Sequence, residues 1–248
     1  MHKSILPLIL LLASSLFSAE MTAVDVVRRA DQLMRGKSSI TEMTMTIVKP
    51  EWSREVGIKS WAKGEKQALI MITAPARDKG TTFLLRDKEV WNWVPSIERV
   101  VKIPPSMMMQ SWMGSDFTND DLVKESSIIK DYTHSFAGDS TIDGRACWKL
   151  ELIPIEDAAV VWGKVWVWID KVDFLQLYVE YFDEDAILIN RMIMSDIKKM
   201  GGRLLPCKME MIPADKQGHK TVMVYTAAQF DIPIQDSFFS EQNMKKVR

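Results

Sequence analysis

Few residues of the chain have side chains and spacings that suit catalysis. Only three of its 248 residues are histidines and two are cysteines, and no HxxxH, HExxH, CxxC or GxSxG pattern occurs. The sequence therefore shows no recognisable zinc site, redox pair or nucleophile elbow. A glycosidase-like carboxylate pair is spatial rather than sequential, so the sequence leaves it open. We expect no enzyme, no metal and no cofactor.

Two acidic clusters are the next candidates, as cation sites. Asp183, Glu184 and Asp185 follow one another, as do Asp120 and Asp121. Neither cluster has the ligand spacing of a calcium-binding loop. Solvent-exposed turns explain both clusters better.

The most unusual segment carries apolar side chains where a polar loop is the normal expectation. The chain contains 17 Met and 9 Trp. Five of these residues fall in one short stretch: Met107, Met108, Met109, Trp112 and Met113. Such a loop either packs into a cavity or exposes an apolar patch. Because the thioether adapts to ligands of different shape, a movable lid and a permanent plug both remain open.

Apolar side chains at period two extend this region into expected strands. Two tryptophan pairs and one further group have this spacing: Trp91 with Trp93, Trp166 with Trp168, and Met43 with Met45 and Ile47. In a strand, each set shares a face. These side chains either fill a core or wall a cavity, as the interiors of curled sheets often do.

The composition is that of a folded protein with almost balanced charge. The chain has 32 Lys+Arg against 33 Asp+Glu, a formal net charge of −1, and 47% of its residues are hydrophobic. Without a broad positive field, nucleic-acid binding is not expected.

The first residues have the pattern of an export signal. His2 and Lys3 precede an apolar run from Ile5 to Phe17, which is too short to span a bilayer. We expect cleavage near Ala19, so that residues 1–19 are a signal peptide and residues 20–248 form the mature chain. A retained membrane anchor is the alternative.

Export would bring the two cysteines into a compartment where disulfides form. Cys147 and Cys207 stand far apart in the sequence, and each also fits a buried position on a strand. Their pairing is left open.

The mature chain begins with one predicted helix and continues in strands almost to its end. Thr22 can cap a helix that runs to about Arg35, with Gly36 at its C-terminal cap. From Ser38 to Phe230 the apolar period drops to two. We expect a single domain with an antiparallel meander of about ten to eleven strands, and a sheet of that length must curl, split or close.

A membrane-spanning β-barrel is the competing architecture for an exported chain with many alternating segments. Charged residues within the expected strands, such as Lys59, Lys149 and Glu210, argue against a lipid-facing band. A sheet with one wet face and one buried face fits the pattern better.

Two short motifs flank the methionine-rich loop. The stretch from Trp91 to Val100 contains a W-x-P-x-x-x-R element, and the stretch from Gly114 to Leu122 reads GSDF-x-x-x-DL. Together they resemble the bacterial outer-membrane lipoprotein-sorting protein family, which is related to the periplasmic carrier LolA. The resemblance covers nearly the whole mature chain, from the opening helix to the closing Phe238-Phe239 region.

This resemblance implies a fold and a function. The fold would be mainly β (α+β): a single curled antiparallel sheet that forms an unclosed half-barrel, with helices covering the concave face. The chain would be a monomeric periplasmic carrier whose apolar cavity holds acyl chains of a lipoprotein or another lipid and takes them toward the outer membrane. An inner-membrane RND-type exporter and an outer-membrane acceptor are the implied partners. The alternative is a periplasmic adaptor that senses lipid or peptide and regulates a membrane partner.

The same expectation assigns roles to individual residues. The candidate acyl-binding residues are those of the apolar loop and strands: Met43, Met45, Ile47, Trp91, Trp93, Met107, Met108, Met109, Trp112, Met113, Trp166 and Trp168. Arg99 is the candidate for head-group contact or gating, and Arg77 and Lys79 flank the same region. Solvated charges at strand ends are the other interpretation of all three.

Overall fold

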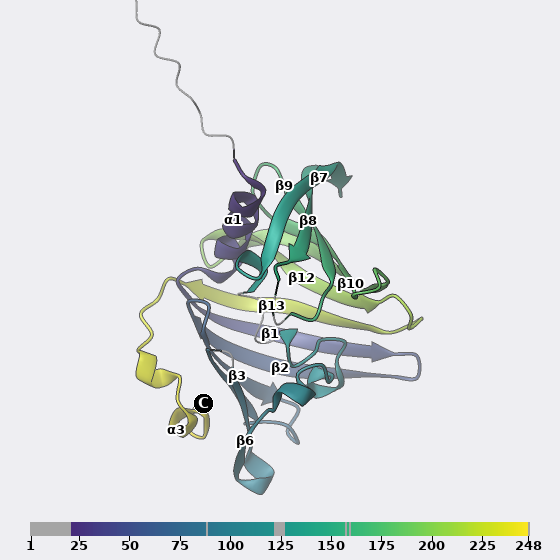
Figure 1. Ribbon diagram of the computed structural model, residues 1–248. Coiled ribbons are helices and arrows are strands. Elements are labelled where there is room, and N and C mark those ends of the chain that lie inside the picture. Colours follow the sequence, from purple (N-terminus) through teal and green to yellow (C-terminus); the bar gives the residue numbers. More distant parts are fainter. Residues whose placement is uncertain (1–20, 88, 122–126, 157, 159, 248) are drawn as a thin grey trace, which may run out of the picture.

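The computed structural model describes residues 21–87, 89–121, 127–156, 158 and 160–247. It shows a mainly β protein built on one antiparallel sheet of thirteen strands (Figure 1). The expected signal peptide, residues 1–19, lies outside the described residues. In the part of the chain that is described, no helix has the length and apolar character needed to cross a membrane.

Helix α1 (Ala23–Arg35) opens the described chain, and six strands follow it: β1 (Ser38–Lys49), β2 (Trp52–Lys63), β3 (Gln67–Ala74), β4 (Thr82–Arg86), β5 (Glu89–Val94) and β6 (Arg99–Lys102). Seven strands form the second half: β7 (Tyr132–Ile142), β8 (Arg145–Pro154), β9 (Lys164–Asp170), β10 (Gln176–Phe182), β11 (Leu188–Met200), β12 (Arg203–Pro213) and β13 (Lys220–Phe230). A short helix, α3 (Glu241–Met244), lies near the C-terminus.

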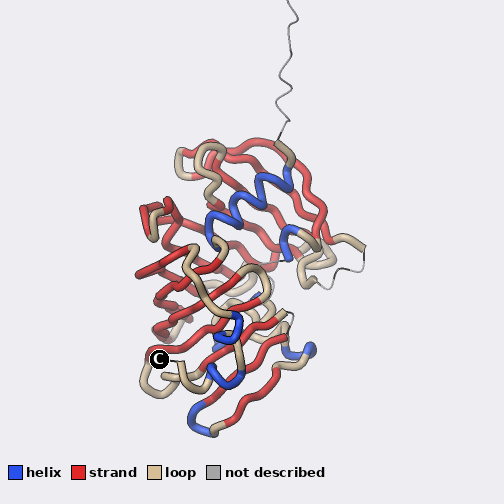
Figure 2. The backbone as a smooth tube through the Cα atoms, turned by 90° about the vertical axis from the view of Figure 1, so that its left-hand side faces the viewer, coloured by secondary structure: helices blue, strands red, loops and turns tan. Residues whose placement is uncertain are grey.

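Helix α1 begins and ends where the sequence predicts. The Thr22 hydroxyl accepts a hydrogen bond from the Asp25 N–H, and the Asp25 carboxylate reaches back to the backbone of Thr22, which completes a capping box. At the other end the Gly36 N–H donates to the carbonyl of Gln32, and Gly36 has a positive φ of 66° that suits glycine. The apolar side of α1 packs against the sheet, across whose strands the helix lies (Figure 2).

The order of strands follows a simple path. The sheet reads β6-β5-β4-β3-β2-β1-β13-β12-β11-β10-β9-β8-β7. The chain therefore starts in the middle of the sheet, runs outward to β6, crosses to the opposite edge at β7, and returns to the middle, where Ser39 of β1 lies opposite Phe230 of β13. Residues 103–131 join the two edges, and their described parts, residues 103–121 and 127–131, are here called the crossing segment. Apolar side chains of this segment, among them Trp112 and Ile128, pack on one face of the sheet.

The predicted single antiparallel sheet without closure is confirmed, because β6 and β7 are its two ends and do not pair with each other. The predicted count of ten to eleven strands is too low. The sheet has thirteen strands, in which the short β4 pairs with β3 and β5, and the short β5 pairs with β4 and β6. Cys147 and Cys207 are free thiols, buried on β8 and β12.

Apolar side chains pack on both faces of the sheet. The largest cluster lies on the face under α1 and the crossing segment and includes Val26, Trp112 and Leu150. On the other face, Phe239 and Met244 from the C-terminal region cover Trp61 and Trp91. Helix α1 and helix α3 therefore pack against different faces, and the sheet is not strongly curled, so the expectation of a curled half-barrel with helices covering its concave face is wrong in these two points.

Candidate functional site

A cavity of about 320 Å³ lies between α1, the crossing segment and the sheet. Small-molecule sites in proteins are commonly about 300–1,000 Å³, so the cavity is large enough for a ligand. Its apolar lining comes from α1, from strands on both sides of the β1–β13 pair and from the crossing segment, and includes Val27, Met43, Ile58, Ile70, Trp112, Phe117, Val165 and Tyr225.

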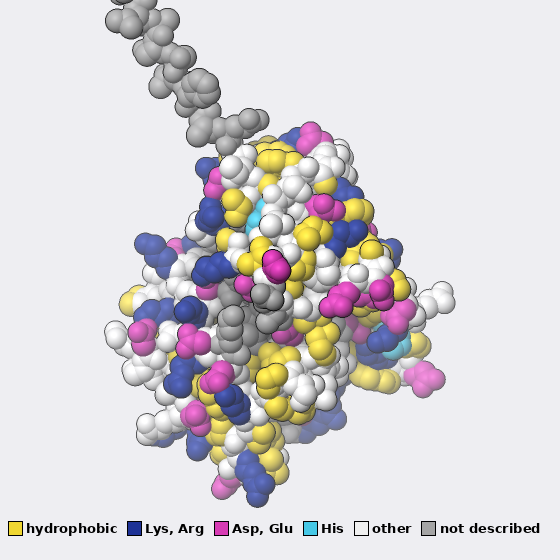
Figure 3. Space-filling model, viewed as in Figure 1, with side chains coloured by type: hydrophobic (Ala, Val, Ile, Leu, Met, Phe, Trp, Pro, Cys, Tyr) yellow, Lys and Arg dark blue, Asp and Glu magenta, His cyan; other side chains and the backbone are white. Residues whose placement is uncertain are grey.

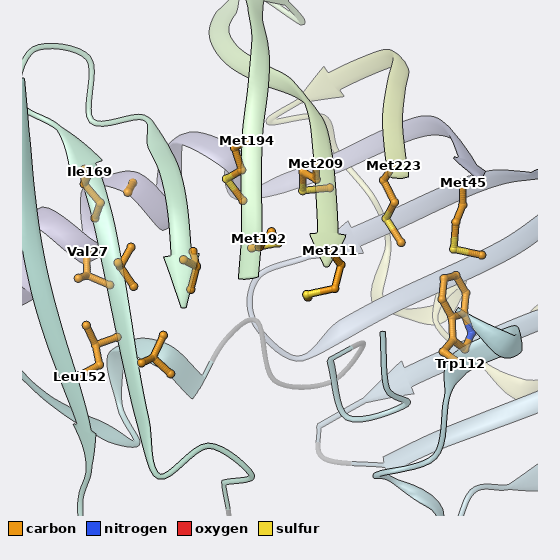
Figure 4. Packing of buried hydrophobic residues seen from close by; sticks show 14 of the residues in the cluster. Val27, Met45, Trp112, Leu152, Ile169, Met192, Met194, Met209, Met211 and Met223 are labelled. Carbon is orange, nitrogen blue, oxygen red and sulfur yellow. The ribbon is translucent and has the colours of Figure 1, made fainter. Parts of the chain in front are cut away.

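Methionine side chains form two rows across this wall (Figure 4). The first row runs over four neighbouring strands, each residue directly opposite the next: Met194 of β11, Met209 of β12, Met223 of β13 and Met45 of β1. In the second row, Met192 lies opposite Met211. Opposed side chains in antiparallel strands have Cβ atoms about 4.5–5.5 Å apart, so each row presents nearly continuous thioether surface.

Strand periodicity explains why these methionines face one way. Met192 and Met194 stand two residues apart on β11, and Met209 and Met211 do the same on β12, so each pair points to one side of the sheet. Met has three rotatable bonds and a polarisable sulfur, and it fills irregular space without one fixed shape. The wall can therefore repack around an apolar ligand.

Trp112 closes the cavity from the side of the crossing segment. Its side chain is only 2% exposed, and its ring meets that of Phe83 edge to face, with 5.6 Å between centroids. The segment around it is compact, because the Trp112 N–H donates to the carbonyl of Phe117 (2.8 Å) and the Asp120 N–H to that of Met108 (2.9 Å).

A buried ion pair anchors the same segment to the sheet. Lys49 Nζ lies 2.6 Å from Asp116 Oδ1, and the Asp116 side chain is 4% exposed. The Asp116 N–H donates to Thr221 Oγ1 (2.9 Å), and the Thr221 hydroxyl donates to Asp116 Oδ2 (2.7 Å). Arg54 donates a further hydrogen bond to the carbonyl of Met113. The Asp of the GSDF motif is thus a structural anchor on β1 and β13.

Several polar groups of the cavity lining are paired. Asp31 and Arg35 form an ion pair at 2.8 Å on α1.

Burial, with a smaller contribution from the negative charge of Asp120, raises the pKa of the Tyr132 phenol well above its ordinary value. Tyr132 therefore stays protonated at neutral pH. Among the described residues, no group of three or more His, Cys, Asp or Glu is placed to hold a metal ion.

The structure brings some of the candidate residues together. Met43 and Trp112 line the cavity. Met45 and Ile47 are fully buried in the cluster that surrounds it. These four residues come from β1 and from the crossing segment, which meet on the same face of the sheet.

The tryptophan pairs lie elsewhere. Trp91 and Trp93 pack with the C-terminal residues Phe239 and Met244 on the opposite face. Trp166 and Trp168 alternate with Val165 and Val167, which belong to the cavity-side cluster, so the two Trp rings point away from the cavity. Lys149 Nζ lies 3.3 Å from the centroid of the Trp166 ring and forms a cation–π contact there.

The remaining candidates are divided between the solvent-exposed surface and the core. Met107 and Met109 are exposed, whereas Met108 packs against Leu85 and Val90 and Met113 against the main core. Arg99, at the start of β6, is exposed to solvent. The cationic candidate is thus separate from the buried methionine rows.

Sequence reasoning missed the methionines of the second half. Met192, Met194, Met209, Met211 and Met223 all line the cavity. Two Met-x-Met patterns on consecutive strands were the available signal, because antiparallel neighbours joined by a tight turn place such patterns side by side. Their proximity to Met43 and Met45 depends on the β1–β13 pairing, for which the sequence carries no local signal.

Comparisons with known proteins show which solved structures share this fold. A family model described as an uncharacterized protein family matches residues 64–246. A DUF1329 family protein from Desulfovibrio piger has a similar structure, with a TM-score of 0.82 and 23% identity over 90% of this chain and 97% of that chain. A search of curated proteins found no match.

Two further solved structures are similar to a comparable degree. One, described as an outer-membrane lipoprotein-sorting protein domain, is from Vibrio parahaemolyticus (TM-score 0.79, 21% identity, 90% of this chain and 98% of that chain). The other is a LolA superfamily protein from Nitrosomonas europaea (TM-score 0.77, 20% identity, 90% of this chain and 99% of that chain). The TM-scores of these three structures establish a shared fold, and at identities of 20% to 23% the likeness shows the fold alone.

Proposed function

We propose that this chain, which belongs to the protein family whose model matches residues 64–246, is a periplasmic acyl-chain carrier. The chain has the LolA-like, outer-membrane lipoprotein-sorting fold. Its cargo would be a lipoprotein or another lipid that travels toward the outer membrane. It would work as a monomer and without covalent chemistry. An inner-membrane RND-type exporter and an outer-membrane acceptor would be its partners.

The observation that carries this proposal is the methionine-lined cavity. Its volume of about 320 Å³ and its apolar wall suit a hydrocarbon chain. Exposing a chain of roughly 16 carbons to water costs on the order of 12 kcal/mol, at about 0.8 kcal/mol per methylene. A free acyl chain therefore does not cross an aqueous compartment, and a protein that carries one must offer an apolar surface of similar area.

Release of the cargo matters as much as binding. A rigid, close-packed pocket would hold one ligand shape tightly, whereas thioether side chains adapt and give up a ligand more readily. In this proposal the acyl chain lies on the face of the open sheet that α1 covers, between the methionine rows, α1 and Trp112. The ion pair of Asp116 with Lys49 keeps the crossing segment in place while the wall repacks.

Two measurements test the proposal. The purified protein should release acyl lipid on extraction, identified by mass spectrometry, and native mass spectrometry should show the lipid bound to the intact protein. Mixed with labelled donor vesicles and unlabelled acceptor vesicles, the protein should speed lipid transfer between them. Failure to bind any acyl lipid or acyl probe would end the proposal.

An adaptor that senses lipid is the second candidate, and one observation favours it. Trp112 lines the cavity while Met107 and Met109 of the same segment are exposed, so a ligand that displaces Trp112 would change the outer surface. The vesicle experiment separates the two functions. A carrier moves lipid between membranes, whereas an adaptor binds lipid and leaves the transfer rate at its spontaneous value.

A further inference from the structure

Four exposed apolar side chains lie on or next to β6, the edge strand of the sheet, within thirteen residues of sequence. Ile97 (57% exposed) lies in the turn before β6, Val101 (50%) on β6, and Met107 (40%) and Met109 (54%) at the start of the crossing segment. The lower part of Figure 3, where Figure 1 places β6, shows yellow apolar side chains among dark blue Lys and Arg and magenta Asp and Glu side chains. We refer to Ile97, Val101, Met107 and Met109 as the rim surface.

The rim surface continues into the wall of the cavity. On β6, Val101 and Ile103 point to the same side by alternation, and Ile103 packs against both the main core and the Leu85 cluster. Met108, between the two exposed methionines, packs against the same cluster, in which Leu85 and Ala68 also line the cavity. An apolar path therefore leads from the solvent-exposed rim to the cavity.

The backbone of β6 and of the residues that follow it suits contact with lipid better than pairing with a β-strand of another protein. Strand β6 has only four residues, and Pro104 and Pro105, which lack an N–H, follow soon after it. It therefore offers few groups for pairing with the strand of another protein. The exposed methionines are flexible and match disordered hydrocarbon, and the exposed Arg99, two residues after Ile97, can reach the lipid head groups.

We propose that the rim surface docks the protein on a lipid bilayer by shallow insertion of its four apolar side chains. This inference rests on the proposed function, because it supplies the place where an acyl chain passes between a membrane and the cavity. Apolar residues at an otherwise polar surface are the ordinary means of interfacial binding.

Vesicle flotation tests the docking without any cargo. The probes are vesicles of phosphatidylcholine alone and vesicles in which phosphatidylglycerol replaces part of it. The test variant combines Ile97→Ser, Val101→Ser, Met107→Ser and Met109→Ser. The matched control combines Val172→Ser and Ile187→Ser, because these residues are 77% and 58% exposed in turns outside the rim surface. A smaller variant, Met107→Gln with Met109→Gln, serves if the fourfold variant fails to fold.

We expect wild type and control to float with vesicles, and the rim variant to partition at least about tenfold less, because it loses the apolar area that inserts. The docking proposal is overturned if wild type does not float with either vesicle, if the rim variant floats as well as wild type, or if control and rim variant lose binding equally.

Binding of a fluorescent fatty acid in vesicle-free solution keeps the two proposals apart. The rim variant should bind this probe as wild type does, since the methionine rows are unchanged. A wild-type protein that floats with vesicles but does not bind the probe would contradict the carrier function and leave the docking surface standing.

Discussion

At the scale of single residues, the cavity combines a soft wall with a firmly held cover. Met192, Met194, Met209, Met211 and Met223 supply thioethers from three neighbouring strands. Opposite them, Trp112 is buried in a segment that a carboxylate–ammonium pair fixes to the sheet. Adaptability and anchoring therefore belong to different residues and can be altered separately.

The methionine wall should bind acyl chains through its apolar surface. We expect the double variant Met192→Ser, Met211→Ser to bind a fluorescent fatty acid about tenfold more weakly, since the apolar area in contact with the ligand shrinks. The matched variant Met192→Leu, Met211→Leu should bind within about threefold of wild type, because Met and Leu are similar in volume and polarity. Equal affinities of the Ser and Leu variants would show that these residues do not touch the ligand.

The anchor of the crossing segment should contribute to stability. Asp116→Asn leaves the ammonium of Lys49 largely buried without its countercharge, and we expect the free energy of unfolding in urea to fall by about 3 kcal/mol. In a Lys49→Met background the buried carboxylate of Asp116 is already without its countercharge, so the same change should leave the free energy of unfolding unchanged or slightly raise it. An identical cost in both backgrounds would mean that the ion pair is not the source of the effect.

At the scale of elements, helix α1 and strand β7 form one side of the cavity region. Helix α1 provides Val27, Ala30 and Met34 to the lining, and it contacts β7, β9 and β12. Tyr132 of β7 lines the cavity as well. The stability of α1 is therefore coupled to the integrity of the cavity.

The capping box of α1 tests how much the start of this helix contributes to the stability of the fold. Thr22→Ala removes the hydroxyl that accepts from the Asp25 N–H, and we expect a loss of about 1 kcal/mol in the free energy of unfolding. Thr22→Ser keeps the hydroxyl and should stay within a few tenths of a kcal/mol. Thermal unfolding followed by circular dichroism measures both variants.

His134 should make stability depend on pH. Burial lowers the pKa of its imidazole below the ordinary 6.5, although the ring also contacts the Ile128 carbonyl at 2.8 Å. The unfolded chain therefore binds this proton more readily than the folded protein, and the free energy of unfolding should fall as pH drops below 6.5 toward the lowered pKa of the folded state.

Urea unfolding between pH 8 and pH 5 checks this expectation. His134→Gln should remove part of the slope, and His219→Gln, which changes the other histidine of the described chain, is the matched control. A slope that is unchanged in His134→Gln, or lost equally in the control, would contradict the assignment to His134.

Local patterns predict these elements well, but they predict their partners poorly. The Thr22 cap, the Gly36 stop and the period-two strands all depend on neighbouring residues, and the structure confirms them. Alternation also shows that Trp166 and Trp168 share a face of the sheet, but it does not show which face. In the structure both rings lie on the face away from the cavity. The face is decided by long-range packing, above all by where α1 and the crossing segment lie.

At the scale of the whole molecule, the path of the chain explains why the cavity is covered. A chain that ends its first meander at β6 and starts its second at β7 must carry the connection across the sheet. The crossing segment thus covers one face as a consequence of strand order, and its apolar residues Trp112 and Phe117 line the space beneath it.

Hydrogen exchange measured by mass spectrometry should distinguish a movable cover from a fixed plug. We expect a bound fatty acid to slow exchange in residues 103–121 and in α1, while the paired amides of β1 and β13 stay protected with or without ligand. Slowing confined to these covering elements indicates a lid that the ligand holds closed. Exchange that is slow and unchanged throughout indicates a plug.

The pairing of β1 with β13 also constrains how the molecule is made. The first and last strands of the chain lie side by side in the middle of the sheet, so the contacts that join its two meanders have a very large sequence separation. During translation, the six-strand half waits without its neighbour until β13 has emerged. Completion of the sheet is thereby postponed until both meanders have been synthesised.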